Sequence, residues 1–419
     1  MDDPIIVAQA GDTVRQWGEF QFPGIERLPD GRLHVTYTPA GYKDSASDYG
    51  KPVAHAVSSD AGKTWTGVSQ EAATGHKDLS SAGTLLANGD RLTGVRRKTI
   101  KVTDNIRRML PKPLAGHPCM FKAEDFPKKL AGYRAFRLPA GKTHWQEEYA
   151  DVKISGAVRG IIAADVEINI SGEIRSMKNG VLPFPSIGRE ASTCQSGITL
   201  KDGTVLFTTH YVRLVEGKLR EDMAIAFLAS TDHGHTWRLK SEIPYQPDKQ
   251  NDPTWKERDE LGWHEGFVEP DITLLPDGSV FCLMRTTVGS TVIGPTYWSR
   301  STDGGGTWSR PEIFDDCGVL PRLLTLKNGV TLACYGRPGF YLRATNDPSG
   351  TKWGKRVEII MPSFNRNNCN WHNRDTCAYG GLAALGDGSA LVVYSDFEYP
   401  RPPHRTACKT ILARKITVQ

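Results

Sequence analysis

Long apolar runs, paired cysteines and clusters of basic residues are all missing from this chain of 419 residues. No apolar run reaches the length of a membrane helix, so we expect no association with a membrane. The eight cysteines include no Cys-x-x-Cys pair, which argues against a zinc site. The net charge of +5 is small, and no run of Lys and Arg suits a nucleic-acid footprint. A compact anionic ligand is therefore expected rather than a nucleic acid.

A signal peptide is also missing from the start of the sequence. The first residues, 1–4, read Met-Asp-Asp-Pro and lack the basic and apolar regions of such a peptide. We therefore expect a soluble protein that is either cytoplasmic or a secreted or periplasmic mature form.

Glycine and proline are frequent, and one short pattern is repeated. The 42 Gly and 26 Pro residues indicate many short strands and turns rather than a helical bundle. The frame Ser-x-Asp-x-Gly-x-Thr-Trp occurs at 58–65, 230–237 and 301–308, with weaker copies at 140–145 and 346–353. In a tight turn the Asp accepts hydrogen bonds from amides, the Gly permits a positive φ and the Trp packs on a neighbour.

This frame resembles the Asp-box, or BNR repeat, of the sialidase-like superfamily. The resemblance implies a β-propeller, in which such turns lie on the outer rim of the blades. It describes how the chain folds and leaves the activity open.

A second repeat runs in phase with the first. Hairpin turns of the form Leu-x-x-Gly, each between strand-like segments, occur at 28–31, 86–89, 200–203, 275–278, 326–329 and 385–388. Their spacing, mostly about 50 to 75 residues, is typical of one four-stranded blade per repeat. Six turns predict an all-β, six-bladed propeller of the sialidase type, formed by residues 1–419 as a single domain.

The long gap between the second and third turns leaves an alternative open. A loop or hairpin insertion is expected within about 98–180, and its strand-like part at 146–180 allows a seventh blade instead. Both ends of the chain, 5–8 and 410–416, are strand-like, and we expect them to share the blade that closes the ring.

Charged residues at strand ends suggest where a ligand binds. Arg285 and Arg337 each end an apolar strand-like run, and His210 ends a third. An arginine in such a place needs an anionic partner, either a protein carboxylate or a ligand. Polar residues at the starts of inner strands give further candidates for substrate binding, namely His76, Glu190 and His264.

The resemblance to sialidases extends to individual residues. Glu269, in Glu-Pro-Asp-Ile-Thr-Leu, is similar to the family's inner-strand Glu that activates a tyrosine nucleophile. Tyr379, in Ala-Tyr-Gly-Gly-Leu, resembles that nucleophile. Arg285 and Arg337 are similar in placement to the second and third arginines that hold the substrate carboxylate.

The acid/base and the first arginine are less well matched. The family's acid/base is an Asp on a loop of the first blade, where Asp44 and Asp48 both occur. The family's aromatic-Arg-Ile-Pro motif is matched by residues 20–23, with Gln21 in the Arg position. A neutral amide does not make the bidentate charged contact of an arginine, so ordinary sialidase activity is not expected.

Together these features predict a retaining, exo-acting glycoside hydrolase that cleaves acidic sugars from an oligosaccharide or polysaccharide. Tyr379, deprotonated by Glu269, attacks the anomeric carbon, and Asp44 or Asp48 acts as acid and then base. A neutral nucleophile suits a substrate with a carboxylate near that carbon, because a carboxylate nucleophile would be repelled.

Two other interpretations stay open. A polysaccharide lyase cleaves uronate glycans by β-elimination, for which His210 and Tyr211 supply acid/base groups and an arginine neutralises the uronate. A non-catalytic glycan-binding propeller is the third interpretation, although a binder has no need of Glu269 together with Tyr379. No cofactor is expected in any of these. A structural calcium ion would fit the fold by analogy, but no ligand motif supports it.

Overall fold

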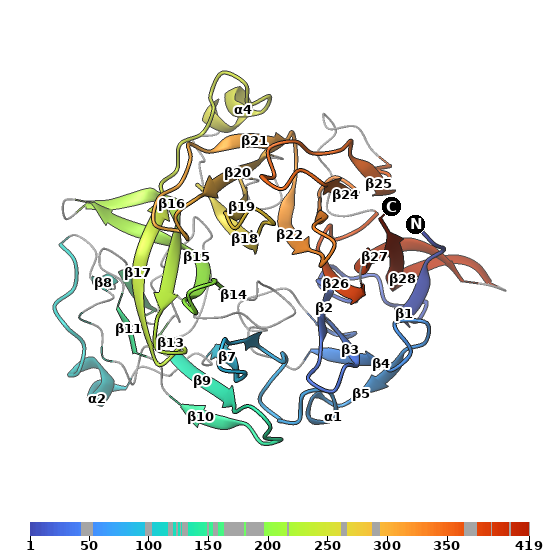
Figure 1. Ribbon diagram of the computed structural model, residues 1–419, viewed down its shortest axis with the longest axis horizontal. Helices are drawn as coiled ribbons and strands as arrows, with labels where there is room; N and C mark the ends of the chain where they lie inside the picture. The colour runs from blue at the N-terminus through green and yellow to red at the C-terminus, as the bar shows by residue number, and fades with distance from the viewer. Residues whose placement is uncertain are drawn as a thin grey trace.

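The computed structural model of the chain is an all-β, six-bladed propeller (Figure 1). Six sheets surround a central axis, and each has its first strand nearest the centre. None of the helices in the described part of the chain is long and apolar enough to cross a membrane. The structure describes the whole chain except residues 43–52, 97–102, 116–119, 123–124, 126, 128–132, 149–150, 154–157, 163–179, 182–196, 216–217, 261–265, 287–293, 364–374, 387, 402–403 and 419.

The first three blades follow one another along the chain. Blade one contains β2 (Gly24–Arg27), β3 (Leu33–Tyr37), β4 (Ala54–Ser58) and β5 (Thr66–Val68). Blade two contains β6 (Thr84–Leu85), β7 (Arg91–Arg96), β9 (Tyr133–Leu138) and β10 (Gln146–Glu148). Blade three contains β14 (Ile198–Thr199), β15 (Val205–Val215), β16 (Lys218–Ser230) and β17 (Thr236–Ile243), with β11 (Asp151–Lys153) parallel to β17 at its edge.

The other three blades complete the ring. Blade four contains β18 (Val268–Leu274), β19 (Val280–Arg285), β20 (Thr296–Ser301) and β21 (Glu312–Asp315). Blade five contains β22 (Val319–Thr325), β23 (Thr331–Gly336), β24 (Phe340–Thr345) and β25 (Val357–Ile360). Blade six contains β26 (Gly380–Gly386), β27 (Ser389–Arg401), β28 (His404–Thr417) and β1 (Ile5–Gln9). Short helices lie in the loops: α1 (Gln70–Thr74), α2 (Asp104–Arg107) and α4 (Trp255–Glu260).

The described strands of the long gap between the second and third turns form no seventh blade. Within it β9 and β10 complete blade two, and β11 extends blade three. The rest of its described strands form a separate three-stranded sheet of β8 (Met120–Lys122), β12 (Val158–Ile162) and β13 (Gly180–Val181). The count of six, predicted from the six Leu-x-x-Gly turns, is confirmed.

The two ends of the chain close the ring in blade six. Strand β1 pairs antiparallel with β28, with Ile5 opposite Ala413 and Gln9 opposite Thr410. The first strand of the chain is therefore the outermost strand of the last blade, and the two termini lie near each other (Figure 1). Because blade six contains strands from both ends of the chain, backbone hydrogen bonds between β1 and β28 close the ring.

The repeated eight-residue frame forms nearly the same turn in each copy. The Asp at its third position accepts hydrogen bonds from the Thr backbone N and Oγ1, for example Asp232 from Thr236 at 2.9 and 2.6 Å. In two copies the Trp Nε1 donates to the carbonyl of the turn glycine, as in Trp237 to Gly234 at 3.0 Å, whereas Trp308 Nε1 donates to Ser241 Oγ at 3.0 Å. The segment 346–353 makes these bonds too. We call the four segments 58–65, 230–237, 301–308 and 346–353 the Asp–Trp turns.

Each Asp–Trp turn also packs against the blade that precedes its own. A Cβ added to the turn glycine would overlap a leucine of the preceding blade at all four turns. The pairs are Gly62 with Leu391, Gly234 with Leu92, Gly305 with Leu206 and Gly350 with Leu275. Each of these glycines also has a positive φ. Each turn therefore requires a glycine for two reasons: the backbone has a positive φ, and a Cβ would overlap the neighbouring leucine.

We predict that Gly234→Ala destabilises the protein by about 2–4 kcal/mol. The added Cβ meets a positive φ of 87° and the side chain of Leu92, which combines backbone strain with overpacking. Gly141→Ala is the matched control, because φ is 70° there but no atom lies within 4 Å of the added Cβ. Chemical denaturation measures both, and an equal loss in the two variants would contradict the role of the leucine contact.

Asp271 joins the inner strands of blades four and five. Its Oδ2 accepts a hydrogen bond from Leu323 N in β22 at 2.8 Å, and its Oδ1 accepts one from Ile272 N at 2.9 Å. The side chain is buried. Burial raises the pKa of the Asp271 carboxyl to about 7, although the charge of Arg322 and the backbone bonds oppose the shift.

We predict that the free energy of unfolding falls as pH rises from about 4 to about 7 at this site. In that range the unfolded carboxyl, with a pKa near its ordinary value of about 4, loses its proton, whereas the folded one retains it. Urea unfolding at several pH values should show a flatter pH dependence for Asp271→Asn. Asp202→Asn is the control, because hydrogen bonds from Thr204 lower the pKa of that carboxyl. An unchanged slope in Asp271→Asn would contradict the assignment.

Candidate active site

The fold brings four of the predicted site residues together at one end of the ring. Glu269 lies near the start of β18, and Arg285 is the last residue of β19. Because these strands are antiparallel, with Val268 opposite Arg285, the start of one lies beside the end of the other. Arg337 directly follows β23 and Tyr379 directly precedes β26. The four side chains thus come from blades four, five and six.

Glu269 is the centre of the hydrogen-bond network. The Tyr379 hydroxyl donates to Glu269 Oε1 at 2.6 Å. Glu269 Oε2 lies 2.7 Å from Arg285 Nη1 and accepts a hydrogen bond from Leu320 N at 3.0 Å. Arg285 Nη1 also lies 3.3 Å from the Tyr379 hydroxyl oxygen. One carboxylate oxygen is therefore held by the protein, while the other faces the phenol.

Arg337 places a second positive charge beside the same phenol. Its guanidinium carbon lies 5.7 Å from the centre of the Tyr379 ring and 6.0 Å from that of Trp17. Its Nη2 donates to the Cys377 carbonyl at 3.1 Å, and only 7% of the residue is exposed. Guanidinium groups at these distances from aromatic rings are in the range of cation–π attraction.

The electrostatics keep the phenol protonated when nothing else is bound. Burial raises the pKa of Tyr379 well above its usual range, and the negative charge of Glu269 raises it further. The charges of Arg285 and Arg337 oppose this shift. Burial lowers the pKa of the Arg337 guanidinium. Tyr379 therefore needs a neighbouring base before its oxygen is a nucleophile, and Glu269 is in hydrogen-bond reach.

Strained backbone surrounds these side chains. Five non-glycine residues at or beside the site have positive φ, namely Phe22, Glu269, Leu320, Arg337 and Ala378, with values between 37° and 76°. Such conformations cost about 1–3 kcal/mol each and persist only where the surroundings hold them. Their concentration at one place is an independent sign of a functional site.

His210 and Tyr211 lie in β15 of the neighbouring blade three. The His210 Nδ1 accepts a hydrogen bond from the backbone amide of Glu269 at 3.3 Å, which brings it to the edge of the group. Tyr211 pairs with Ala224 through its backbone, and its side chain is outside the described residues. Four more predicted residues fall outside the described ranges: Asp44, Asp48, Glu190 and His264.

The other two predicted substrate-binding residues make contacts within the protein. His76 Nδ1 accepts from Asp78 N at 3.1 Å, and the ring packs on Phe136 of blade two. The Gln21 side chain is fully buried. Its surrounding donors assign its amide orientation, in which the oxygen accepts from Lys409 Nζ at 3.0 Å and Gly18 N at 3.3 Å. The amide that replaces the expected arginine is thus bound by the protein itself.

The aromatic side chains beside Tyr379 were not predicted from the sequence. Phe22 meets the Tyr379 ring edge-on with centroids 5.0 Å apart, and Trp17 meets Phe22 in the same way at 5.7 Å. The buried thiol of Cys377 accepts from Phe22 N at 3.3 Å. Residues 20–23 resemble a sialidase motif, but the contacts of Phe22 depend on the tertiary fold, which a short motif does not specify.

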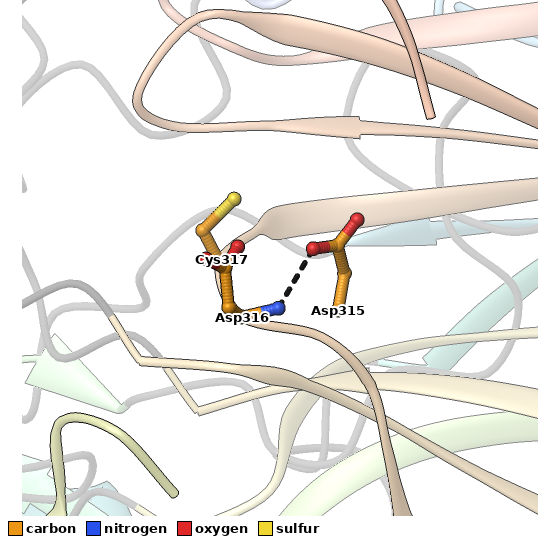
Figure 2. A group of neighbouring side chains, drawn as sticks. All are labelled: Asp315, Asp316 and Cys317. Atoms are coloured by element: carbon orange, nitrogen blue, oxygen red, sulfur yellow. Dashed lines mark hydrogen bonds between the residues drawn. The ribbon is translucent and has the colours of Figure 1, made fainter. Parts of the chain in front are cut away.

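A second cluster of acidic groups and sulfur lies at the end of β21 (Figure 2). Asp315, Asp316 and Cys317 each offer an atom within 4.8 Å of the others, a spacing that suits a metal ion. Arg356 Nη1 lies 3.0 Å from Asp315 Oδ1, 3.1 Å from Asp316 Oδ1 and 3.6 Å from Cys317 Sγ. The Arg356 guanidinium thus supplies the positive charge beside these three residues. We therefore do not interpret them as a metal site.

The fold and this geometry can be compared with known proteins. No protein-family model matches the chain, and no curated protein sequence matches it. A crystal structure of a protein of unknown function from Dyadobacter fermentans has a TM-score of 0.55 and 16% identity, covering 95% of this chain and 94% of that one. A Hadza microbial sialidase has a TM-score of 0.50 and 12% identity, covering 95% of this chain and 65% of that one.

An α-L-arabinofuranosidase from Fusarium graminearum has a TM-score of 0.49 and 11% identity, covering 99% of this chain and 97% of that one. At such identities the likeness shows the fold alone. The chain is a six-bladed β-propeller, and its neighbours in structure include a sialidase.

Proposed function

We propose that the protein is a retaining glycoside hydrolase in which Tyr379 is the nucleophile and Glu269 its base. The 2.6 Å hydrogen bond from the Tyr379 hydroxyl to Glu269 carries this proposal. It joins a phenol that stays protonated on its own to a carboxylate in the right place to take its proton. A tyrosine with only a packing role would not require a hydrogen bond to a carboxylate at this position.

The first half of the reaction forms a covalent intermediate. The Tyr379 proton moves to Glu269 Oε1 while the phenol oxygen bonds to the anomeric carbon and the glycosidic C–O bond breaks. The leaving oxygen takes a proton from a carboxylic acid, for which Asp44 and Asp48 are the candidates. Arg285 and Arg337 stabilise the negative charge that develops on the phenol oxygen.

The second half releases the sugar. The carboxylate that gave up its proton now takes one from water, and the water oxygen attacks the anomeric carbon. The bond between that carbon and the Tyr379 oxygen breaks, and Glu269 returns its proton to the phenol. The anomeric configuration is retained because the carbon is inverted twice.

The charges of the site favour an acidic sugar as substrate. Two guanidinium groups, Arg285 and Arg337, accompany one carboxylate, Glu269, so these groups leave an excess of positive charge for an anion. A carboxylate near the anomeric carbon also explains a neutral nucleophile. Because Gln21 is bound within the protein, we propose a uronate or an altered nonulosonate rather than an ordinary sialoside.

A polysaccharide lyase is the second candidate, and the position of His210 favours it. His210 contacts the backbone of Glu269, the residue whose carboxylate binds the phenol and Arg285. A lyase of this kind would remove the uronate C5 proton with a histidine or tyrosine while an arginine neutralises the carboxylate. The two reactions leave different products, since only elimination creates an unsaturated uronate.

We predict that Glu269→Gln lowers kcat about 10²–10⁴-fold and that Tyr379→Phe lowers it at least as much. The first change removes the base and the second removes the attacking oxygen. Tyr297→Phe is the matched control, because it deletes a hydroxyl on the third strand of blade four that contacts Asp248 N. Reducing-sugar release from a panel of uronate-bearing glycans and sialosides measures the effect. Unchanged turnover in Tyr379→Phe would rule out its role as nucleophile.

We predict that His210→Ala retains hydrolysis within about tenfold, because the hydrolase assigns no proton transfer to this histidine. The same glycan panel is read for reducing sugar and for the ultraviolet absorbance of an unsaturated uronate. Growth of that absorbance in the wild type, and its loss in His210→Ala, would replace the hydrolase with the lyase.

A further inference from the structure

A buried lysine, Lys409, contacts the segment that carries Trp17 and Phe22, the aromatic residues beside Arg337 and Tyr379. Lys409, in β28 of blade six, is only 5% exposed, and its ammonium lies 4.6 Å from the centre of the Phe397 ring. Burial lowers the pKa of Lys409 to about 8, while Cys377 and Glu19 oppose that shift. At neutral pH the side chain therefore still carries its charge, and a buried charge needs partners.

All three hydrogen-bond acceptors of this ammonium come from one short segment that precedes β2 of blade one. Lys409 Nζ donates to the Gln16 carbonyl at 2.5 Å and to the Glu19 carbonyl at 3.2 Å. Its third contact is the Gln21 amide oxygen at 3.0 Å. An ammonium has three N–H donors, so the segment uses all of them. Lys409 is thus committed to the protein and does not serve as a contact for substrate.

The segment that Lys409 holds is strained. Phe20 and Phe22 have φ values of 50° and 53°, a region that side chains other than glycine rarely adopt. Two such residues cost about 1–3 kcal/mol each, so other contacts must fix the segment. Glu19 contributes as well, since its carboxylate accepts from Gln16 N at 3.2 Å and from Gly41 N at 2.6 Å.

The same segment supplies the aromatic wall beside the catalytic pair. Phe22 meets the Tyr379 ring edge-on at 5.0 Å, and Trp17 lies 6.0 Å from the Arg337 guanidinium. A movement of residues 16–22 would therefore change the packing of both Tyr379 and Arg337.

We propose that Lys409 is a positioning residue for the candidate active site. It fixes segment 16–22, and through Phe22 and Trp17 it sets the orientation of Tyr379 and Arg337. Gln21 is part of this device: it supplies an acceptor for Lys409, whereas an arginine at that position would bring a second buried cation against the ammonium. The link to catalysis rests on the proposed function, but the link to Tyr379 does not.

The test uses the full-length protein and two lysines of the same strand. Lys409→Met removes the ammonium and keeps most of the volume, while Lys415→Met changes an exposed residue of β28. Hydrogen exchange of peptides that cover residues 12–22 reports on the segment. We expect protection to fall at least about tenfold in Lys409→Met, because hydrogen bonds to a charged group are lost. No change is expected in Lys415→Met.

A second readout follows Tyr379 without any substrate. Incorporation of 3-fluorotyrosine gives each tyrosine a ¹⁹F resonance, and Tyr379→Phe identifies the one that belongs to Tyr379. That resonance should shift or broaden in Lys409→Met and stay in place in Lys415→Met. On any glycan that the wild type cleaves, Lys409→Met should lower kcat/KM at least about tenfold.

The outcomes separate this proposal from the proposed function. Unchanged protection of residues 12–22 in Lys409→Met, or looser protection with an unmoved Tyr379 resonance, overturns the positioning role. Unchanged kcat/KM overturns it too. If the wild type cleaves no glycan of the panel, the proposed function fails while exchange and resonance still decide the role of Lys409. Should Lys409→Met not fold, Gln21→Leu removes one acceptor and must loosen the same peptides.

Discussion

The contact between a turn glycine and a leucine of the preceding blade joins four of the six blades of this propeller to their neighbours. At the Asp–Trp turns of blades one, three, four and five, a Cβ on the glycine would overlap that leucine. The contact therefore sets how closely successive sheets approach. Strand β1 closes the ring by pairing with β28, so the first strand of the chain completes the last blade. The glycine–leucine contacts and the pairing of β1 with β28 therefore help to set the spacing of the blades, and with it the spacing of the strand ends near the axis.

That spacing is what creates the candidate site. Glu269 and Tyr379 are 110 residues apart in sequence, and their hydrogen bond forms because blades four and six present strand ends to the same central region. Arg285 belongs to the same place because β19 returns antiparallel to β18. The resulting network keeps one carboxylate oxygen bound to Arg285 and Leu320 N and directs the other at the phenol. Such an arrangement suits a base whose orientation must not vary.

The site balances charge differently from the pattern that its sequence resembles. A buried amide, Gln21, replaces the first arginine, and the nearest cation to it is Lys409, which donates to the protein and not to the centre. Two arginines and one carboxylate surround the phenol. Of the described residues before β2, Phe22 and Trp17 contribute to the site by packing against Tyr379 and Arg337.

The sequence by itself determined the turns and favoured six blades over seven, because Leu-x-x-Gly hairpins and Asp–Trp turns are local and depend on a few neighbouring residues. It also pointed to Glu269, Arg285, Arg337 and Tyr379 through short motifs, although no motif states that the four side chains meet. Only the tertiary structure decided that Gln21 is bound by Lys409 and that β9 and β10 belong to blade two. These features join residues far apart in the chain, and their partners are selected by the closure of the ring, which no local pattern encodes.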